Sequence, residues 1–169
     1  MINSSVAVAN KFIEFAADED RGLTQMQLQK LAYIAHGWSL AIYNEPLISE
    51  PPLAWDYGPV YADLREALKS YGSRGVSRPI LRGDYEPSCF NEHSDEKVDG
   101  IFTDTQQHLL AEIFRSYGEF EAFQLSALTH KEGTPWHRVY HKMGRRSGAI
   151  PDDIIKEHFL DLKEGRSAA

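Results

Sequence analysis

The chain has 169 residues, 42% of them hydrophobic and 25% charged, which is the length and composition of a globular domain with a hydrophobic core. Its net charge of −7 argues against a general nucleic-acid binder, because such a protein needs a positive field to displace counterions from phosphates. The single cysteine, Cys89, excludes an intrachain disulfide and a Cys-rich zinc site within one chain, and it suits a reducing cytosol.

The first predicted helix begins at a serine cap, Ser4 or Ser5, and reaches about residue 18. Apolar residues recur on one of its faces at helical spacing. They are Val6, Ala9, Ile13 and Ala16, with Phe12 beside them. This face is therefore expected in the core, and a polar break follows over residues 18–22.

A second helix is predicted after Thr24, because Thr24 and Gln27 have the spacing of a capping box. It runs to about residue 43 and carries an apolar stripe made of Leu28, Leu31, Ala32, Ala35 and Trp38. Further apolar residues, Tyr33 and Ile34 among them, fall outside that stripe. Because a helix that is apolar on several sides is buried on several sides, we expect this helix to be the central one.

Prolines prevent a helix over much of the next segment, residues 44–55. Within it, Leu47 and Ile48 are expected to be extended. A third helix is predicted from Pro59 to about residue 71, because the missing amide hydrogen of proline costs little in a first helical turn. Gly72 then ends this helix.

Residues 76–100 show no helical period and form a predicted irregular or extended insert. Short extended pieces at 79–81, at Tyr85 and at 89–90 predict a β-hairpin within it. Seven acidic residues fall between Asp84 and Asp104. The insert is therefore expected to present an acidic surface.

Four further helices are predicted in the rest of the chain. Thr103 and Gln106 repeat the capping-box spacing. Thr134 is a cap followed by proline at the first helical position. Two acidic residues follow Pro151, at the positive end of the last predicted helix. The helices are expected over about 103–117, 121–129, 134–142 and 151–162.

The predicted fold class is therefore mainly α. Residues 1–169 are expected to form a single compact helical domain of about six or seven helices, with a small extended or β-hairpin insert and a flexible tail at 164–169. The N-terminus lacks a basic segment that leads into an apolar run, and no apolar run approaches the ~18 residues of a membrane span. We therefore expect a cytoplasmic protein.

Three histidines near the C-terminus raise the question of a metal site. His137 and His141 lie four residues apart, which is a helical spacing by which two imidazoles can hold zinc, and His130 lies nearby in the sequence. However, a zinc-peptidase motif needs Glu directly after the first histidine, where this chain has Arg138, and the surrounding Lys and Arg would repel a cation. We predict no metal and no cofactor, with a metal-dependent enzyme that uses the three histidines as an alternative.

Covalent catalysis has weaker support in the sequence. No Gly-x-Ser-x-Gly elbow is present, and the glycines at 72 and 75 lack the strand–loop–helix setting of a phosphate-binding loop. Cys89 has His93 four residues on, but acidic residues surround it and would disfavour the thiolate. We therefore predict that the protein is not an enzyme and has no catalytic residues.

A basic stretch covers residues 131–146, where five Lys or Arg residues stand against one acid. They are Lys131, Arg138, Lys142, Arg145 and Arg146. A charge run of this kind can be an ordinary solvated face. It can also dock an acidic surface of a partner protein, which makes these five the predicted partner-binding residues. Contact with an RNA phosphate, as in a phage regulatory protein, is a further alternative.

Several motifs occur in a characteristic order. The first is Leu28-Gln-Lys-Leu-Ala-Tyr-Ile-Ala-His-Gly-Trp38, the second is Ala54-Trp-Asp-Tyr-Gly-Pro-Val60, and Thr129-His130 and Pro135-Trp136 follow. In this order they resemble the Panacea domain family of SocA- and GepA-like, phage-associated and antitoxin proteins. The matching residues, which we expect to be structural, are Leu28, Lys30, Leu31, Tyr33, Trp38, Trp55, Tyr57, Gly58, Pro59, Val60, His130, Pro135 and Trp136. An aromatic residue of this set that is exposed would instead be an interface anchor.

The resemblance implies a function in protein binding. Members of the family are antitoxins that neutralise different toxins by direct contact, and SocA-like members are proteolytic adaptors that deliver a toxin to a protease. The expected partner is therefore a protein: a toxin encoded by an adjacent gene, or a protease in the adaptor case. We expect no membrane partner and consider nucleic acid a weaker candidate, and simple self-assembly remains a further possibility.

Overall fold

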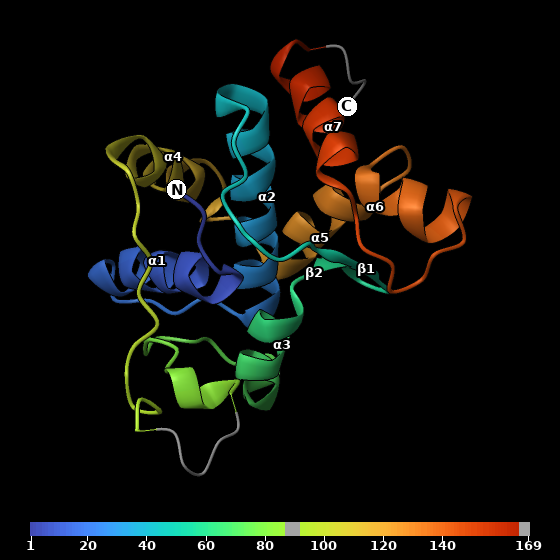
Figure 1. Cartoon of the computed structure of the whole chain (residues 1–169). Helices are drawn as coiled ribbons and strands as arrows, with labels where there is room; N and C mark the ends of the chain where they lie inside the picture. The colour runs from blue at the N-terminus through green and yellow to red at the C-terminus, as the bar shows by residue number, and fades with distance from the viewer. Residues whose placement is uncertain (87–91, 166–169) are drawn as a thin grey trace.

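The computed structural model describes residues 1–86 and 92–165. Within these ranges the chain forms seven α-helices and one two-stranded antiparallel hairpin, which confirms the predicted mainly α fold class with a small β-hairpin (Figure 1). The predicted extended piece at 89–90, the lone Cys89 and most of the predicted tail fall outside the described residues. No helix of the described residues is long and apolar enough to cross a membrane.

Helices α1 (Ser5–Asp18) and α2 (Gln25–Tyr43) agree closely with the prediction. The Ser4 side chain caps α1 by accepting from the Ala7 amide. At the start of α2, Thr24 and Gln27 form the capping box that their spacing predicts. Most of α2 is buried, and it contacts α1, α3, α4, α5, α7 and β2. It is therefore the central helix, as expected (Figure 1).

The C-terminal half of α2 packs closely against α7 (Asp152–Lys163). At Gly37 a Cβ atom would lie only 2.2 Å from Cε2 of Phe159, so the two helices approach at a point where only glycine fits. Beside it, the Ile48 amide donates to His36 Nδ1 (3.1 Å). Because an amide can only donate, the proton of the neutral ring is on Nε2, which donates to Asp152 Oδ1 (2.8 Å).

The hairpin consists of β1 (Leu53–Trp55) and β2 (Gly58–Val60). Pro59 pairs with Ala54 in this ladder, so the prediction that Pro59 opens the third helix is wrong. Helix α3 begins three residues later and covers Ala62–Leu68, followed by a 3₁₀ turn at Lys69–Tyr71. A proline fits a two-stranded ribbon, where one edge of each strand needs no amide donor.

The described residues of 76–86 and 92–100 contact α1 and form no hairpin ladder with one another. Among the described residues they contain a 3₁₀ turn at Arg82–Asp84 and an isolated antiparallel bridge between Leu81 and Lys97. The buried Asn10 side chain accepts from the Ile80 amide (2.7 Å) and donates to the carbonyl oxygens of Ile80 and Val98 (3.0 and 2.9 Å). One amide side chain therefore fixes both ends of the insert.

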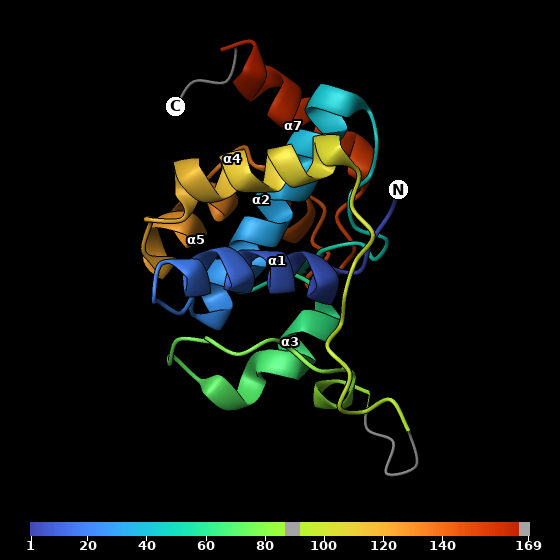
Figure 2. The same ribbon diagram turned by 90° about the vertical axis from the view of Figure 1, so that its left-hand side faces the viewer.

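Helix α4 (Asp104–Tyr117) begins at the predicted Thr103–Gln106 capping box and lies beside α1 on one side of α2 (Figure 2). Helix α5 (Ala122–His130) follows. The next helix starts at the predicted Thr134 cap as α6 (Pro135–His137) and continues as a π-helical segment, Arg138–Lys142. The predicted helix over 134–142 is thus present, but its second half is a π-helix and not an α-helix.

Candidate functional site

The tip of the β1–β2 hairpin is the centre of the candidate site. Asp56 and Tyr57 form its two-residue turn, because Trp55 pairs with Gly58. Gly58 has a φ of +108°, a conformation that side chains other than glycine rarely adopt. A Cβ atom there would also lie 3.0 Å from Cε of Lys30. The motif therefore needs glycine at this position both for its backbone angle and for contact with α2.

Two neighbouring residues of α2 hold one strand of the hairpin. The Lys30 Nζ donates to the carbonyl oxygen of Pro59 at 3.0 Å. The Gln29 side chain both accepts from the Tyr61 amide (2.8 Å) and donates to the Tyr61 carbonyl (3.0 Å). The exit of the hairpin is thereby fixed to the central helix by three hydrogen bonds.

Residues from the C-terminal third of the chain hold the other side. Ser126 Oγ of α5 donates to the Tyr57 carbonyl oxygen (3.0 Å), and Trp136 Nε1 of α6 donates to the Trp55 carbonyl oxygen (2.6 Å). The Tyr140 hydroxyl donates to Asp56 Oδ1 (2.5 Å). The motif segments at 28–38, 54–60 and 129–136 thus meet at this hairpin, although many residues separate them in the sequence.

The motif residues differ in their surroundings. Leu28, Leu31 and Tyr33 lie in the hydrophobic core, and Trp38 packs edge-on against Phe159 with ring centroids 5.4 Å apart. Pro135 is buried, and the half-buried His130 ring lies edge-on to Trp136 at 5.1 Å. Val60 lines the groove described below.

Lys30 is the least expected member of this set, because its side chain is fully buried. Burial penalises the ammonium form and lowers the pKa of Lys30 from 10.5 to about 7. Among the described residues, no carboxylate lies within 4.0 Å of Nζ to offset this. The amine can therefore exchange its proton near neutral pH.

A groove of about 660 Å³ opens beside Lys30. Its walls come from the first turns of α2, the hairpin, α3 and the 3₁₀ turn that follows α3. They include Met26, Trp55, Tyr57 and Arg65. The Arg65 guanidinium lies over the Trp55 ring, 4.8 Å from its centroid, a favourable cation–π distance. The Tyr57 side chain is 71% exposed at the hairpin tip, so this motif residue is not a core residue.

The structure places the three predicted histidines in different surroundings. His137 and His141 lie with ring centroids 5.1 Å apart, but His130 Nδ1 is bonded to the Ser126 carbonyl oxygen of its own helix. The His141 ring lies edge-on to Trp136 at 5.4 Å. Among the described residues there is no group of three His, Cys, Asp or Glu side chains placed to hold a metal ion.

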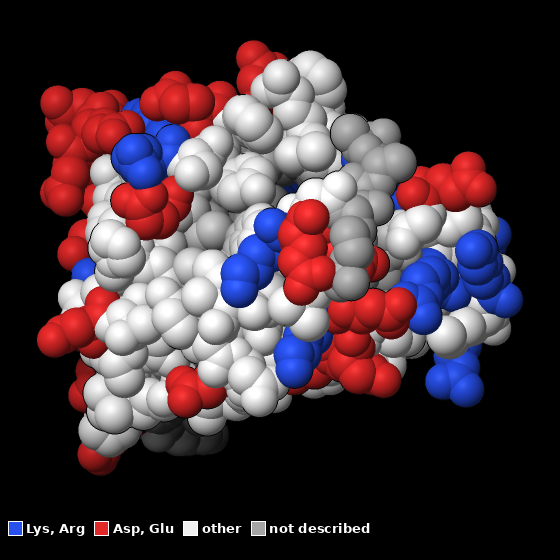
Figure 3. Space-filling model, turned by 90° about the horizontal axis from the view of Figure 1, so that it is seen from above, with Lys and Arg blue, Asp and Glu red and all other residues white. Residues whose placement is uncertain are grey.

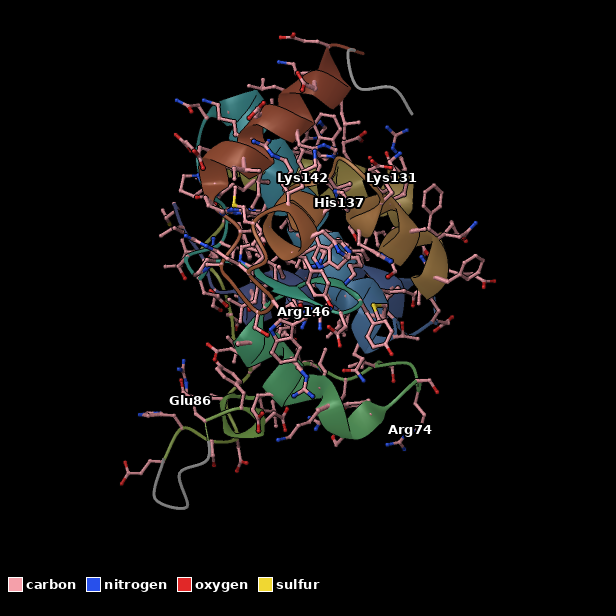
Figure 4. All side chains as sticks on the ribbon, turned by 90° about the vertical axis from the view of Figure 1, so that its right-hand side faces the viewer. Arg74, Glu86, Lys131, His137, Lys142 and Arg146 are labelled. Carbon is pink, nitrogen blue, oxygen red and sulfur yellow. The ribbon has the colours of Figure 1, made fainter. Side chains whose placement is uncertain are left out.

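The basic stretch lies on the same side of the molecule as α6. Figure 3 shows Lys and Arg side chains gathered at that edge, and acidic side chains at the opposite edge. In the view of Figure 4, Lys131, His137 and Lys142 lie at a similar height, and Arg146 lies lower, toward the hairpin. The Arg146 guanidinium lies 5.2 Å from the Tyr140 ring centroid. The basic stretch therefore continues toward the groove, where Ser147 is part of the lining.

Two of the five predicted partner-binding residues contact other side chains of the protein, because Arg146 lies over the Tyr140 ring and Arg138 forms an ion pair. Arg138 is half-buried and forms an ion pair with Glu157 of α7, with Nη1 and Oε2 3.3 Å apart. Lys131, Lys142, Arg145 and Arg146 are exposed. Of these, Lys131, Lys142 and Arg145 form no ion pair with the described residues and are the ones most open to another molecule.

Sequence reasoning missed several residues of the site. Gln29 lies inside the quoted motif, but its paired bonds to Tyr61 have no local signature. Ser126, Tyr140 and Arg65 lie outside the quoted motifs, and only tertiary packing brings them to the hairpin. The sequence contains several Lys and Arg residues that could lie next to Trp55, but only the fold shows that Arg65 does.

Comparison with known proteins adds an independent finding. Residues 28–137 match the model of a family described as "Antitoxin SocA-like, Panacea domain". The chain is also 29% identical to Antitoxin SocA of Caulobacter vibrioides (strain NA1000 / CB15N) over 156 residues, which are 90% of this chain and 80% of that protein. No solved structure matches the chain. The matched region includes α2, the hairpin, α5 and Trp136.

Proposed function

The chain belongs to the antitoxin SocA-like, Panacea domain family, and from this premise we propose that it is an antitoxin that binds a toxin and suppresses its activity by direct contact. The likeness to Antitoxin SocA along 90% of the chain carries this proposal. A sequence match of that length covers α2, the hairpin and α5 together and not only one short motif.

The surface of the protein supports a function in binding. An exposed tyrosine, Tyr57, stands at the tip of a hairpin that is fixed from both sides, and aromatic residues on rigid elements are frequent anchors of protein interfaces. Exposed cations at Lys131, Lys142 and Arg145 belong to the basic stretch, which is followed directly by Ser147 in the lining of the groove. They favour a partner with an acidic patch, because complementary charge speeds encounter.

We infer that the protein suppresses its toxin without chemistry of its own. The family is one of antitoxins, and the histidines that could suggest an enzyme make ring contacts and hydrogen bonds within the protein. The toxin is expected to be encoded by an adjacent gene and to meet this protein in the cytoplasm.

A growth assay tests the proposal. The adjacent gene is expressed from an inducible promoter, alone and together with this chain, and the tagged pair is purified at two ionic strengths. Growth arrest that this chain relieves, with recovery of a complex, is the expected result. Arrest without relief and without a complex would refute the antitoxin proposal. Toxin abundance, measured by immunoblot, separates two mechanisms: it is unchanged for a stoichiometric inhibitor and falls for a proteolytic adaptor.

A further inference from the structure

The groove beside the hairpin contains two buried donors that the protein itself does not fully use. Lys30 Nζ has three hydrogens, and its one hydrogen bond to the described residues goes to the Pro59 carbonyl. Trp55 Nε1 is buried and has no acceptor among the described residues. Both side chains line the groove. The Trp55 indole nitrogen and the ammonium form of Lys30 donate hydrogen bonds and cannot accept one. A complementary ligand must therefore supply acceptor oxygens.

The charge at the groove also favours an anion. Arg65 lies over the Trp55 ring, and no carboxylate of the described residues is within ion-pair distance of it. Lys69, the next cation on this wall, is paired with Glu66. The one acidic side chain of the lining, Asp56, already accepts a hydrogen bond from the Tyr140 hydroxyl. The Arg65 guanidinium and, below about pH 7, the Lys30 ammonium thus face one carboxylate that already accepts a hydrogen bond.

The shape and the rim indicate that the anion belongs to a protein segment. The groove is about 660 Å³, enough for several side chains. Met26 and Val60 provide apolar wall, and the exposed Tyr57 provides an aromatic rim. Tyr, Trp and Arg are the residues that contribute most to protein interfaces, and all three types meet here around a buried lysine.

We propose that this groove binds an acidic side chain of the partner protein, with the Glu or Asp carboxylate on Lys30 and Trp55 Nε1 and flanking apolar residues against Tyr57 and Met26. This proposal deepens the antitoxin function and rests on it for the identity of the partner. Lys30 and Trp55 Nε1 have no exposed surface in the free protein, so the wall of the groove must shift for the carboxylate to complete their hydrogen bonds. The contact then depends on these two donors in addition to net charge.

The groove can be tested without the toxin, with two short blocked peptides as probes. One alternates Glu and Leu, and the other alternates Gln and Leu. Calorimetry at pH 6.5, where Lys30 is mainly protonated, is expected to show at least tenfold tighter binding of the Glu peptide. The indole N–H resonance of Trp55, assigned with Trp55→Phe, is expected to shift during the titration. Equal affinities, or an unmoved Trp55 resonance, would overturn the proposal.

Variants separate the groove from the basic stretch. Lys30→Met removes the amine but nearly keeps the length of the side chain. Arg65→Gln removes a charge from an exposed residue. If one of the two variants folds poorly, the other still tests the groove. Both are expected to remove most of the preference for the Glu peptide. Lys142→Glu, in the basic stretch, is the control and should leave it unchanged. The reverse pattern would assign the peptide to the basic stretch and refute the groove.

The same variants distinguish this inference from the proposed function. If the wild-type chain forms a complex with the toxin and both Lys30→Met and Arg65→Gln bind the toxin as tightly, the groove proposal fails and the antitoxin function stands. If the toxin does not bind the wild-type chain at all, the antitoxin function fails, and the peptide titration alone decides whether the groove accepts a carboxylate.

Discussion

Trp136 donates the hydrogen of its indole nitrogen to the backbone carbonyl oxygen of Trp55, with 2.6 Å between the two atoms. This bond joins two motifs that are 81 residues apart in the sequence. The Trp136 ring also stacks on Tyr140 with centroids 4.6 Å apart, and the Tyr140 hydroxyl reaches the neighbouring Asp56. One aromatic pair of the C-terminal region therefore holds the hairpin that lines the groove.

Trp136→Phe should destabilise the protein by about 1–3 kcal/mol, because it removes the indole donor and leaves the Trp55 carbonyl without that partner. The free energy of unfolding from urea denaturation measures the effect. Trp38→Phe is the matched control, since the Trp38 indole nitrogen has no acceptor among the described residues, and it should cost less. Equal losses for the two variants would show that ring volume, not the hydrogen bond, matters at Trp136.

The buried Lys30 predicts a pH dependence of stability. Its pKa is about 7 in the folded protein and 10.5 in an unfolded chain, so between these values the unfolded chain binds more protons. The free energy of unfolding should therefore rise with pH from about 7 to 10, by an amount on the order of a few kcal/mol. Above about pH 10 the buried Tyr33 and Tyr61, whose pKa values burial raises, oppose the trend.

Two substitutions of Lys30 check this cause. Lys30→Met should flatten the slope and make the protein at least as stable as the wild type at pH 6, because no charge is buried. Lys30→Arg, which stays charged, should be less stable than the wild type at every pH. Lys11→Met, at an exposed ion pair of α1, is the control and should keep the slope. A wild-type stability that is flat between pH 7 and 10 would contradict the burial of a neutral amine.

Gly37→Ala should destabilise the contact between α2 and α7. Alanine favours a helix over glycine by about 1 kcal/mol, but its Cβ would lie 2.2 Å from the Phe159 ring, and overpacking of this kind typically costs about 1–3 kcal/mol or more. The expected net effect is a lower melting temperature. Adding Phe159→Leu to Gly37→Ala should partly restore stability, because the smaller side chain makes room for the new Cβ atom. If Gly37→Ala were as stable as the wild type, α7 would not pack against Gly37 in this way.

The two histidines at helical spacing should not make the protein a zinc protein. We expect well under one equivalent of zinc, by elemental analysis, in protein purified without added metal. The variant in which His137 and His141 are both alanine should keep its helical circular dichroism spectrum, because His141 is exposed and His137 only half-buried. A full equivalent of zinc that this variant loses would contradict the prediction.

Charge reversal on the basic stretch should slow association with the toxin. Lys131→Glu, Lys142→Glu and Arg145→Glu combined are expected to lower the association rate severalfold at low salt, with a smaller effect at high salt, because exposed charges act through screened fields. Arg138 is left unchanged, since its reversal would also break the ion pair with Glu157. Arg115→Glu on α4 is the control for charge reversal elsewhere on the surface, and it also tests whether the loss of an exposed ion pair, here with Glu112, affects association. A loss that is equal at both salt concentrations would argue against electrostatic steering.

Local sequence patterns determined most of the helices. The caps at Ser4, Thr24, Thr103 and Thr134 mark where helices begin, and the apolar spacing of α2 predicts its central place. Such features depend on residues within about four positions of each other. The predicted start of the third helix, Pro59, is too early. Proline suits a first helical turn by local criteria, but in the structure Pro59 pairs with Ala54 in the hairpin.

The sequence by itself therefore determined a mainly helical fold, the ends of most helices and, through its ordered motifs, a resemblance to one family. Only the tertiary structure decided that Lys30 is buried against Pro59, that Tyr57 is exposed and that Arg138 is engaged by Glu157. The physical reason is range. A helix forms from hydrogen bonds and side-chain contacts between near neighbours, whereas the burial and charge state of a side chain depend on every segment that packs around it, however distant in the chain.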